Sequence, residues 1–298
     1  MNKVIVVTGP TASGKTAYAV SLAHKFNAEV VSADSMQIYK YMNIGTAKPT
    51  EAEMEGVPHH MINIVSPLEN FSVVKYQEMA KACIDDILAR GKTPIVCGGT
   101  GLYISSLLYN IKYADIASDD VVRKRLHKEA EIYGNEYLYN KLIQADPKAA
   151  GKIHMNNVKR VVRALEVYEV TGKHFSKYEA ESLSEPTPYE FETLYLEVDR
   201  PVLYERINKR VDEMIESGLV EETKFLYENG MLDGSTASQG ICYKEMLPYV
   251  SELLAGKEDE EILSECAGKL KQSTRNYAKR QITWFKNMNM FKSIYIKN

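Results

Sequence analysis

The sequence predicts an α/β protein in which a parallel sheet is flanked by helices and interrupted by an all-helical insertion. Short β-branched runs at 3–9 and 28–35 end in glycine or polar residues, and a third run within 93–104 enters a glycine-rich turn and helix. This is typical of buried parallel strands. Helical periodicity follows these runs, and the alternation of strand and helix favours right-handed crossovers. From about Asp115 onward, three amphipathic helical patterns follow one another without a strand.

The helices and remaining strands follow in order. One helix is expected to start near Gly14 and another to occupy 73–92, with a stop at Gly91. The insertion contains helical patterns at 119–134, 135–153 and 156–173, and then a polar, proline-containing exit at 174–192. A strand at 192–200, helices within 200–229 and 241–286, and a terminal strand at 291–298 complete the chain. The predicted domains are a core of 1–114 and 190–298 and an insertion of 115–189.

Composition indicates a globular protein of the reducing cytoplasm. The chain has 298 residues and a formal net charge of −3. Its cysteines form no Cys-x-x-Cys pair, which argues against a zinc site or a disulfide framework; they are Cys83, Cys97, Cys242 and Cys266. No segment has the length of a membrane span, and no signal peptide is expected at the start. The mild acidity does not exclude a nucleic-acid partner, because a local basic face is sufficient.

Residues 9–16 read GPTASGKT and match the phosphate-binding pattern G-x-x-x-x-G-K-[ST] in full. The pattern predicts a P-loop NTPase-like core and nucleotide binding, with ATP as the first candidate. Its glycines let backbone N–H groups converge on phosphate, Lys15 reaches a phosphate, and Thr16 can ligate Mg²⁺. The predicted phosphate-binding residues are Gly9, Pro10, Thr11, Ala12, Ser13, Gly14, Lys15 and Thr16.

Two polar residues follow the second and third predicted strands. Asp34 and Thr100 should face the crevice that contains the phosphate loop, since ligands bind beyond the carboxyl ends of parallel strands. Asp34 can bind Mg²⁺, act as a general base or cap a helix, and the residues alone do not decide between these roles. No strand ending in Asp-Glu and no Asn-Lys-x-Asp signature is present, which argues against motor NTPases and GTPases but leaves a small-molecule kinase open.

Basic residues gather in two stretches without intervening acids. One stretch lies at 269–286 and includes Lys279 and Arg280, and the other lies at 152–163. Both can contact RNA phosphates, or they form solvated helix faces. Trp284 is expected to pack rather than to contact RNA. His59 and His60 are expected to pack or to form hydrogen bonds, because no cysteine or carboxylate at ligand spacing accompanies them.

Six segments together resemble the bacterial tRNA dimethylallyltransferases, also called tRNA isopentenyltransferases. They are GPTASGKT at 9–16, SADSMQIYKYMNIGTAKP at 32–49, VPHHMI at 57–62, GGTGLYI at 98–104, NNVKRVVRALEVYEVTGK at 156–173 and STRNYAKRQITWFK at 273–286. The resemblance implies transfer of a dimethylallyl group from dimethylallyl diphosphate to N6 of adenosine 37, in tRNAs reading codons that begin with U. It also implies Mg²⁺ as cofactor and the anticodon stem-loop as partner. We expect a cytoplasmic monomer that contacts no membrane.

The resemblance also implies roles for individual residues. Asp34 matches the general base, and Thr100 a catalytic position beside diphosphate and adenosine. Arg206 and Arg210 match a basic pair, of which Arg210 is the expected diphosphate ligand. The positions matching tRNA contacts are Asp34, Ser35, Met36, Gln37, Thr100, Arg123, Lys159, Arg160, Val161, Val162 and Arg163, to which the basic stretch adds Lys279 and Arg280.

One segment departs from the family pattern. The chain reads SQGICYKE at 238–245, and Cys242 stands where the family commonly has glycine. This change puts the local backbone geometry in question. Three other hypotheses remain beside tRNA prenylation: a small-molecule kinase, a nucleotide-regulated RNA-binding protein, and prenylation of free adenine nucleotides.

Overall fold

The structure, a computed structural model, describes residues 2–113, 119–183, 185–233, 236–288 and 290–296. These residues form two compact units, Met1–Leu108 with Pro188–Asn298, and Tyr109–Thr187. The predicted insertion of 115–189 began at a residue outside the described ones. No helix of the described residues is both long and apolar enough to cross a lipid bilayer.

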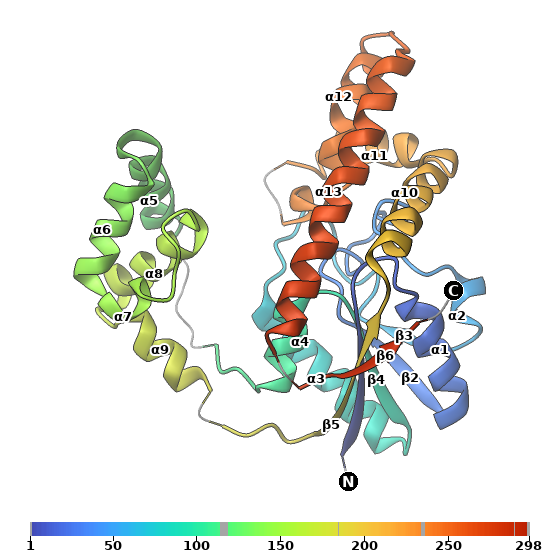
Figure 1. Ribbon diagram of the computed structural model, residues 1–298, viewed down its shortest axis with the longest axis horizontal. Coiled ribbons are helices and arrows are strands. Elements are labelled where there is room, and N and C mark those ends of the chain that lie inside the picture. Colours follow the sequence, from blue (N-terminus) through green and yellow to red (C-terminus); the bar gives the residue numbers. More distant parts are fainter. Residues whose placement is uncertain (1, 114–118, 184, 234–235, 289, 297–298) are drawn as a thin grey trace. The chain divides into compact units, whose positions relative to one another are not determined.

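A six-stranded sheet forms the centre of the first unit (Figure 1). The strands lie in the order β3-β2-β4-β1-β5-β6, and every neighbouring pair is parallel. Their bounds are β1 Lys3–Thr8, β2 Ala28–Ser32, β3 His59–His60, β4 Thr93–Gly98, β5 Glu190–Glu197 and β6 Lys292–Tyr295. The predicted parallel α/β class is confirmed. The two-residue strand β3 was not predicted, since so short a segment carries no periodicity.

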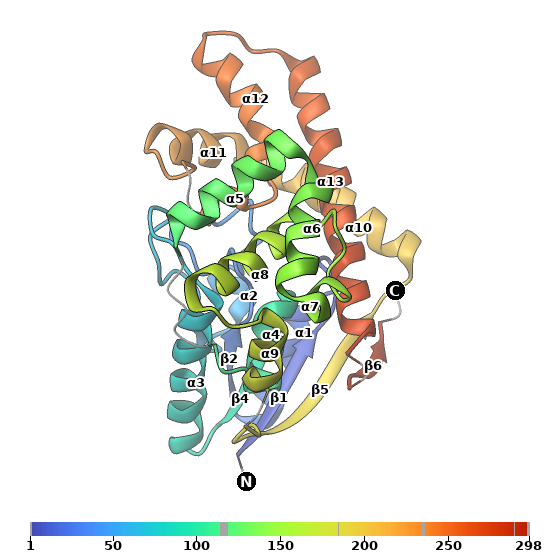
Figure 2. The ribbon, with the colours of Figure 1, turned by 90° about the vertical axis from the view of Figure 1, so that its left-hand side faces the viewer.

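Helices cover both faces of this sheet (Figure 2). Alternate residues of β1 point to opposite faces: Val4 and Val6 join the core beneath α3, whereas Ile5 and Val7 join the core beneath α1. The helices of the unit are α1 Lys15–Phe26, α2 Glu51–Met54, α3 Val73–Ala89, α4 Gly101–Leu108, α10 Arg200–Glu216, α11 Leu219–Glu228, α12 Tyr243–Leu254 and α13 Glu260–Lys286, with a 3₁₀ turn at Ala237–Gln239.

Each of the two long helical stretches predicted near the C-terminal end contains two helices. Gly218 has φ 98° and separates α10 from α11, a left-handed conformation that glycine adopts at little cost. Asp259 caps α13 by accepting hydrogen bonds from the N–H groups of Glu261 and Ile262. The long helix α13 packs against α10, α12 and α4, and it thereby brings residues near 280 to the phosphate loop.

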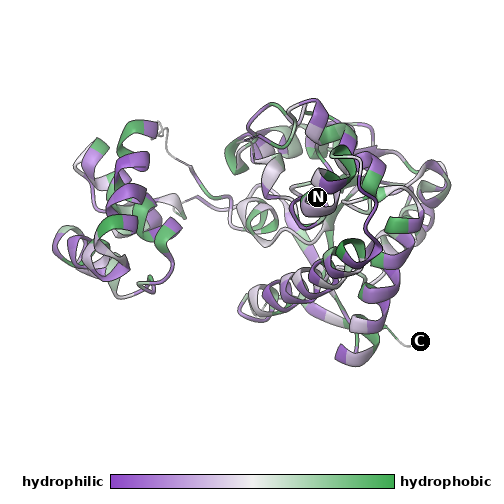
Figure 3. Ribbon diagram, turned by 90° about the horizontal axis from the view of Figure 1, so that it is seen from above, coloured by the Kyte–Doolittle hydropathy of each residue, from purple (hydrophilic) through white to green (hydrophobic). Residues whose placement is uncertain are grey.

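The second unit is helical throughout its described residues. Its helices are α5 Asp120–Tyr133, α6 Asn135–Ala145, α7 Pro147–Ala150, α8 Val158–Thr171 and α9 Phe175–Ser182. Each longer helix carries hydrophobic and hydrophilic residues in turn (Figure 3), and the apolar ones form a separate core that includes Leu126, Leu142 and Val161. Helix α9 lies within the stretch 174–192, which was predicted only as a polar, proline-containing exit.

Candidate active site

The loop between β1 and α1 has the geometry that phosphate binding requires. Gly9 has no room for a side chain, because a Cβ there would lie 2.8 Å from the carbonyl oxygen of Leu196. Gly14 has φ 85° and caps α1, so the first N–H groups of that helix face the loop. Lys15 Nζ donates a hydrogen bond to the carbonyl of Pro10 at 2.8 Å. Burial lowers the pKa of Lys15 to about 8, although nearby Cys97 and Asp34 act in the opposite direction.

Asp34 lies directly beyond β2 and caps the turn that follows. Its Oδ1 accepts hydrogen bonds from the N–H groups of Met36, at 2.9 Å, and Gln37, at 3.3 Å. No hydrogen bond among the described residues uses Oδ2, so one carboxylate oxygen remains for a substrate. The capping role is therefore present, and it leaves room for the predicted role as a base.

Thr100 follows β4 and lies next to the same turn. Its Oγ1 accepts a hydrogen bond from the N–H of Ser35 at 3.0 Å and lies 3.3 Å from Ser35 Oγ. The structure therefore brings the ends of β2 and β4 together, as the parallel sheet predicted.

Two cavities of the first unit meet at Asp34. The smaller one, of about 90 Å³, is polar, and its lining includes Lys15, Thr16, Asp34, Gln37, His59 and Arg210. The larger one, of about 270 Å³, is lined by residues of the 34–47 segment, α10, the 239–244 segment and α13. The residues common to both are Thr11, Asp34, Thr46, Ala47, Arg210 and Tyr277. The shared lining places the two cavities next to each other at Asp34.

Arg210 of α10 is the member of the predicted arginine pair that lines both cavities. Burial lowers the pKa of its guanidinium, and none of the hydrogen bonds or ion pairs among the described residues involves it. Arg206 lies outside the lining of these two cavities. A half-buried cation that has no hydrogen bond or ion pair with a described residue and lines the same cavity as Lys15 is suited to an anion with several charges.

Gln281 and Tyr277 of α13 were not predicted as parts of the site. Gln281 accepts from the N–H of Thr11 at 2.8 Å and donates to the carbonyl of Gly99 at 3.0 Å. Burial above all, and the nearby Asp34, raise the pKa of Tyr277, which lines both cavities. No local signal reveals these roles, because the partners lie far apart in the sequence.

Glu222 of α11 fixes another wall of the site. Its carboxylate accepts hydrogen bonds from three consecutive backbone N–H groups, those of Asn43, Ile44 and Gly45, each at 2.9 Å. The hydroxyl of Tyr243 donates to the same carboxylate at 2.9 Å. The segment held in this way continues into Thr46 and Ala47, which line both cavities.

The predicted RNA-contacting residues of the first unit differ in exposure. Met36 lines the larger cavity, and Gln37 Nε2 donates to the carbonyls of Thr46 and Ala47 at 3.2 and 3.1 Å. Lys279 and Arg280 are exposed and form no ion pair with a described residue. Arg280 lies over the ring of Tyr277, 5.6 Å from its centroid.

Other members of the basic stretch on α13 have partners. Lys271 pairs with Asp212 at 2.6 Å and Lys269 with Glu265 at 3.4 Å. Trp284 packs against the start of α4, where a Cβ on Gly101 would meet its ring at 2.4 Å. Its side chain is nevertheless 44% exposed. The expected packing is therefore present, with part of the ring open to solvent.

In the second unit, acids that lie outside 152–163 neutralise part of the predicted basic cluster. The buried Glu166 accepts hydrogen bonds from Arg123 at 2.9 Å and from Arg163 at 3.0 Å. Glu179 pairs with Arg160 at 2.6 Å. The acid-free appearance of 152–163 holds for the sequence but not for the folded unit.

The other residues of α8 that were predicted to contact RNA are partly exposed to solvent and partly buried in the core of the unit. Lys159 is exposed, and no ion pair among the described residues involves it. Val161 and Val162 are buried in the core of the second unit. Their side chains serve packing, so the basic side chains of 159–163 are the ones left as candidates for RNA contact.

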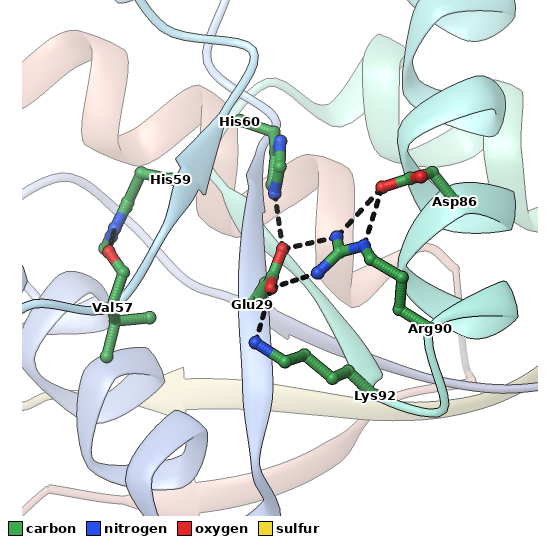
Figure 4. Close-up of polar contacts among 7 residues, drawn as sticks. All are labelled: Glu29, Val57, His59, His60, Asp86, Arg90 and Lys92. Carbon is green, nitrogen blue, oxygen red and sulfur yellow. Dashed lines mark hydrogen bonds and ion pairs between the residues drawn. The ribbon is translucent and has the colours of Figure 1, made fainter.

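The two histidines of β3 have different surroundings (Figure 4). His60 Nε2 lies 2.8 Å from the buried carboxylate of Glu29. Arg90 and Lys92 also contact that carboxylate, and Arg90 above all holds its pKa well below the usual range. His59 Nδ1 lies 2.8 Å from the carbonyl of Val57. The described residues contain no group of three or more His, Cys, Asp or Glu side chains placed to hold a metal ion.

Cys242 adopts a backbone conformation that side chains rarely take. Its φ is 100° and its ψ is −63° at the start of α12, close to the strained γ-turn. The residue is buried and lines the larger cavity. The departure found in the sequence thus falls on a position whose geometry favours glycine.

Comparison with known proteins extends over nearly the whole chain. The family model described as IPP transferase matches residues 37–288. A tRNA dimethylallyltransferase of Acetivibrio thermocellus is 52% identical over 288 residues, covering 97% of this chain and 90% of that protein. One of Geobacillus thermodenitrificans is 48% identical over 285 residues, covering 96% of this chain and 88% of that protein.

Solved structures agree with this relationship. The crystal structure of a tRNA isopentenylpyrophosphate transferase from Bacillus halodurans matches with a TM-score of 0.70 and 42% identity, covering 99% of this chain and 90% of that one. A eukaryotic dimethylallyltransferase acting on tRNA matches with a TM-score of 0.80 and 34% identity, covering 98% of this chain and 73% of that one. The chain belongs to the IPP transferase family.

Proposed function

We propose that the protein is a tRNA dimethylallyltransferase. It transfers the dimethylallyl group of dimethylallyl diphosphate to N6 of adenosine 37, in tRNAs that read codons beginning with U, and releases diphosphate. The observation that carries this proposal is that a polar cavity at the phosphate loop and a larger neighbouring cavity share Asp34 in their linings. A kinase would instead need room for a nucleoside triphosphate and a phosphoryl acceptor, and no feature of the site specifically favours that reaction.

In the proposed reaction, the lone pair of N6 attacks C1 of the allylic group. The C1–O bond breaks, and its electron pair leaves with the diphosphate. The N6 proton passes to Asp34, whose Oδ2 has no hydrogen bond among the described residues. Because the exocyclic amine is a weak nucleophile, a carboxylate that accepts its proton and fixes its direction lowers the barrier. Thr100, which lies beside Asp34, contacts the adenosine or the diphosphate.

The leaving diphosphate gains negative charge as the C1–O bond breaks. Lys15, the N–H groups of the loop and Arg210 are already placed around the polar cavity, so they stabilise this charge without rearrangement. Thr16 lines the same cavity. One hydroxyl together with substrate phosphates suits Mg²⁺, which keeps several waters and seldom uses a full protein cage. When bound, Mg²⁺ supplies further positive charge to the leaving group.

The acceptor is a base that must leave the stacked anticodon loop to reach the cavity. The exposed Lys279 and Arg280, and Lys159, Arg160 and Arg163 in the second unit, are the proposed contacts to the RNA backbone. Ser35, Met36 and Gln37 form the turn beside Asp34 and are proposed to contact the flipped nucleotide.

A labelled-donor assay tests the proposal. The protein is mixed with dimethylallyl diphosphate carrying a labelled prenyl carbon and with unmodified tRNA containing A36-A37-A38. We expect label in the tRNA at A37 and an equal amount of diphosphate. Label in AMP but none in tRNA would favour the free-nucleotide enzyme. ATP consumption with a small metabolite, without transfer of label, would favour a kinase.

A further inference from the structure

One face of helix α10 forms a wall of the larger cavity. Ile207, Arg210, Val211 and Met214 all line it, and their spacing of three and four residues places them on one side of a helix. Ile207 packs against Ala12 of the phosphate loop. With a rise of about 1.5 Å per residue, Met214 lies about 6 Å beyond Arg210 along the helix axis.

The lining residues on this face of α10 change from charged to apolar along the helix. Arg210 lines both cavities, whereas Val211 and Met214 line only the larger one. The 241–243 segment adds Ile241, Cys242 and Tyr243 to the lining. Apart from Asp34 and Arg210, the charged residues in that lining are Lys244 and Arg280, and both are exposed. The lining that α10 and the 241–243 segment contribute beyond Arg210 is therefore mainly apolar, although Gln239 and Thr274 also line the cavity.

We propose that this apolar part holds the five-carbon tail of the donor, and that Met214 limits the length of the tail. The proposal rests on the proposed function and specifies its donor. With the diphosphate at Lys15 and Arg210, the reacting carbon lies beside Asp34, and the tail extends along α10 toward Met214. A cavity of about 270 Å³ is at the lower end of small-molecule pockets. Because it must also admit the adenine, a second five-carbon unit meets the Met214 side chain.

The test compares five-carbon and ten-carbon allylic diphosphates as donors to unmodified tRNA. Met214→Ala removes the end of the wall. We expect the ratio of kcat/KM for the ten-carbon donor to that for the five-carbon donor to rise by about tenfold or more, since a few methylene groups in an apolar pocket support discrimination of that size.

Two control variants isolate the effect. Met214→Leu retains most of the volume and should leave the donor ratio near that of the wild type. Met231 packs against the same core as Met214 but does not line the cavity. Met231→Ala therefore removes an equivalent side chain elsewhere, and it should leave the donor ratio unchanged. An unchanged ratio in Met214→Ala, or an equal rise in Met231→Ala, would overturn the inference.

A binding measurement on the wild-type protein does not depend on how the variants fold. Calorimetry compares inorganic diphosphate with thiodiphosphate analogues of the five-carbon and ten-carbon donors. We expect the five-carbon analogue to bind more tightly than diphosphate and the ten-carbon analogue to lose that gain. Equal gains for both analogues would contradict the assignment of Met214. Absence of five-carbon transfer by the wild type would instead show that the proposed function itself is wrong.

Discussion

Gln281 accepts a hydrogen bond from the backbone N–H of Thr11 at 2.8 Å, across 270 residues of sequence. Its amide nitrogen donates to the carbonyl of Gly99 at 3.0 Å. One side chain of α13 therefore ties the phosphate loop to the turn that carries Thr100. The room for this side chain exists because residue 99 is glycine, whose Cβ would otherwise lie 2.2 Å from Gln281 Nε2.

Replacing Gln281 should disturb both turns at once. Gln281→Met keeps the length of the side chain but leaves the N–H of Thr11 without its acceptor, so the free energy of unfolding should fall by about 1–3 kcal/mol. Misplacement of the loop should lower kcat/KM by up to about a hundredfold. Urea unfolding and the labelled-donor assay measure these effects. Gln272→Met, at an exposed position of the same helix, should change neither quantity, and equal losses in both variants would argue against the tie.

Asp34→Asn separates the two roles of that side chain. Asparagine retains a carbonyl oxygen that accepts from Met36 and Gln37, but it cannot take up the N6 proton. We expect single-turnover transfer to slow by about 10²–10⁴-fold while tRNA affinity is unchanged. Asp34→Ala should lose both the cap and the base. Transfer at the wild-type rate in Asp34→Asn would reduce Asp34 to a capping residue.

The pKa of Lys15 predicts how anion binding depends on pH. This pKa is lowered to about 8 in the unliganded protein, and a bound diphosphate favours the charged form and raises it. Above pH 8, binding must therefore take up a proton, so affinity for inorganic diphosphate should fall as the pH increases. Calorimetry in buffers of different ionisation enthalpy measures this uptake. In Lys15→Arg, whose guanidinium stays charged, the component due to residue 15 should vanish.

Lys279 and Arg280 should contribute to tRNA affinity through phosphate contacts. Changing both to alanine should weaken tRNA binding and reduce the slope of log K against log salt by about 2. Lys269 and Lys271 serve as the matched pair, because each already has an acidic partner, and their replacement should alter the slope less. A change in donor affinity alone would remove Lys279 and Arg280 from the RNA-contacting surface.

Cys242 should carry backbone strain that only glycine relieves. Cys242→Gly and Cys242→Ala both lose the thiol, but only alanine keeps a Cβ at φ 100°. We expect the glycine variant to be more stable than the alanine variant by about 1 kcal/mol. At Cys266, inside α13, the alanine variant should instead be more stable than the glycine variant, by a similar free energy. Thermal unfolding of the four variants tests this reversal, and the same order at both positions would exclude strain at Cys242.

Local patterns in the sequence predicted the parts of the site that lie at the ends of strands. Gly14, Lys15, Asp34 and Thr100 each follow a recognisable strand, and parallel pairing requires those ends to meet. The strand at His59–His60 could not be predicted, because so short a strand is defined by its pairing with β2 and not by its own sequence.

Long-range partners could not be predicted in the same way. Glu166 lies 43 residues from Arg123 and neutralises charges that appear free in the sequence. Gln281 looks like an ordinary polar residue of an amphipathic helix until the fold places it beside Thr11. Such roles depend on tertiary packing, which local periodicity does not contain.

The carboxylate of Glu222 fills a ring of three adjacent backbone N–H groups in the 43–45 segment. Such a set of N–H groups is itself a receptor for anions, and Gly45 lines the larger cavity. Because the chain supplies its own anion there, these N–H groups are already occupied. The 43–45 segment therefore does not compete with the loop at 9–16 for an anion.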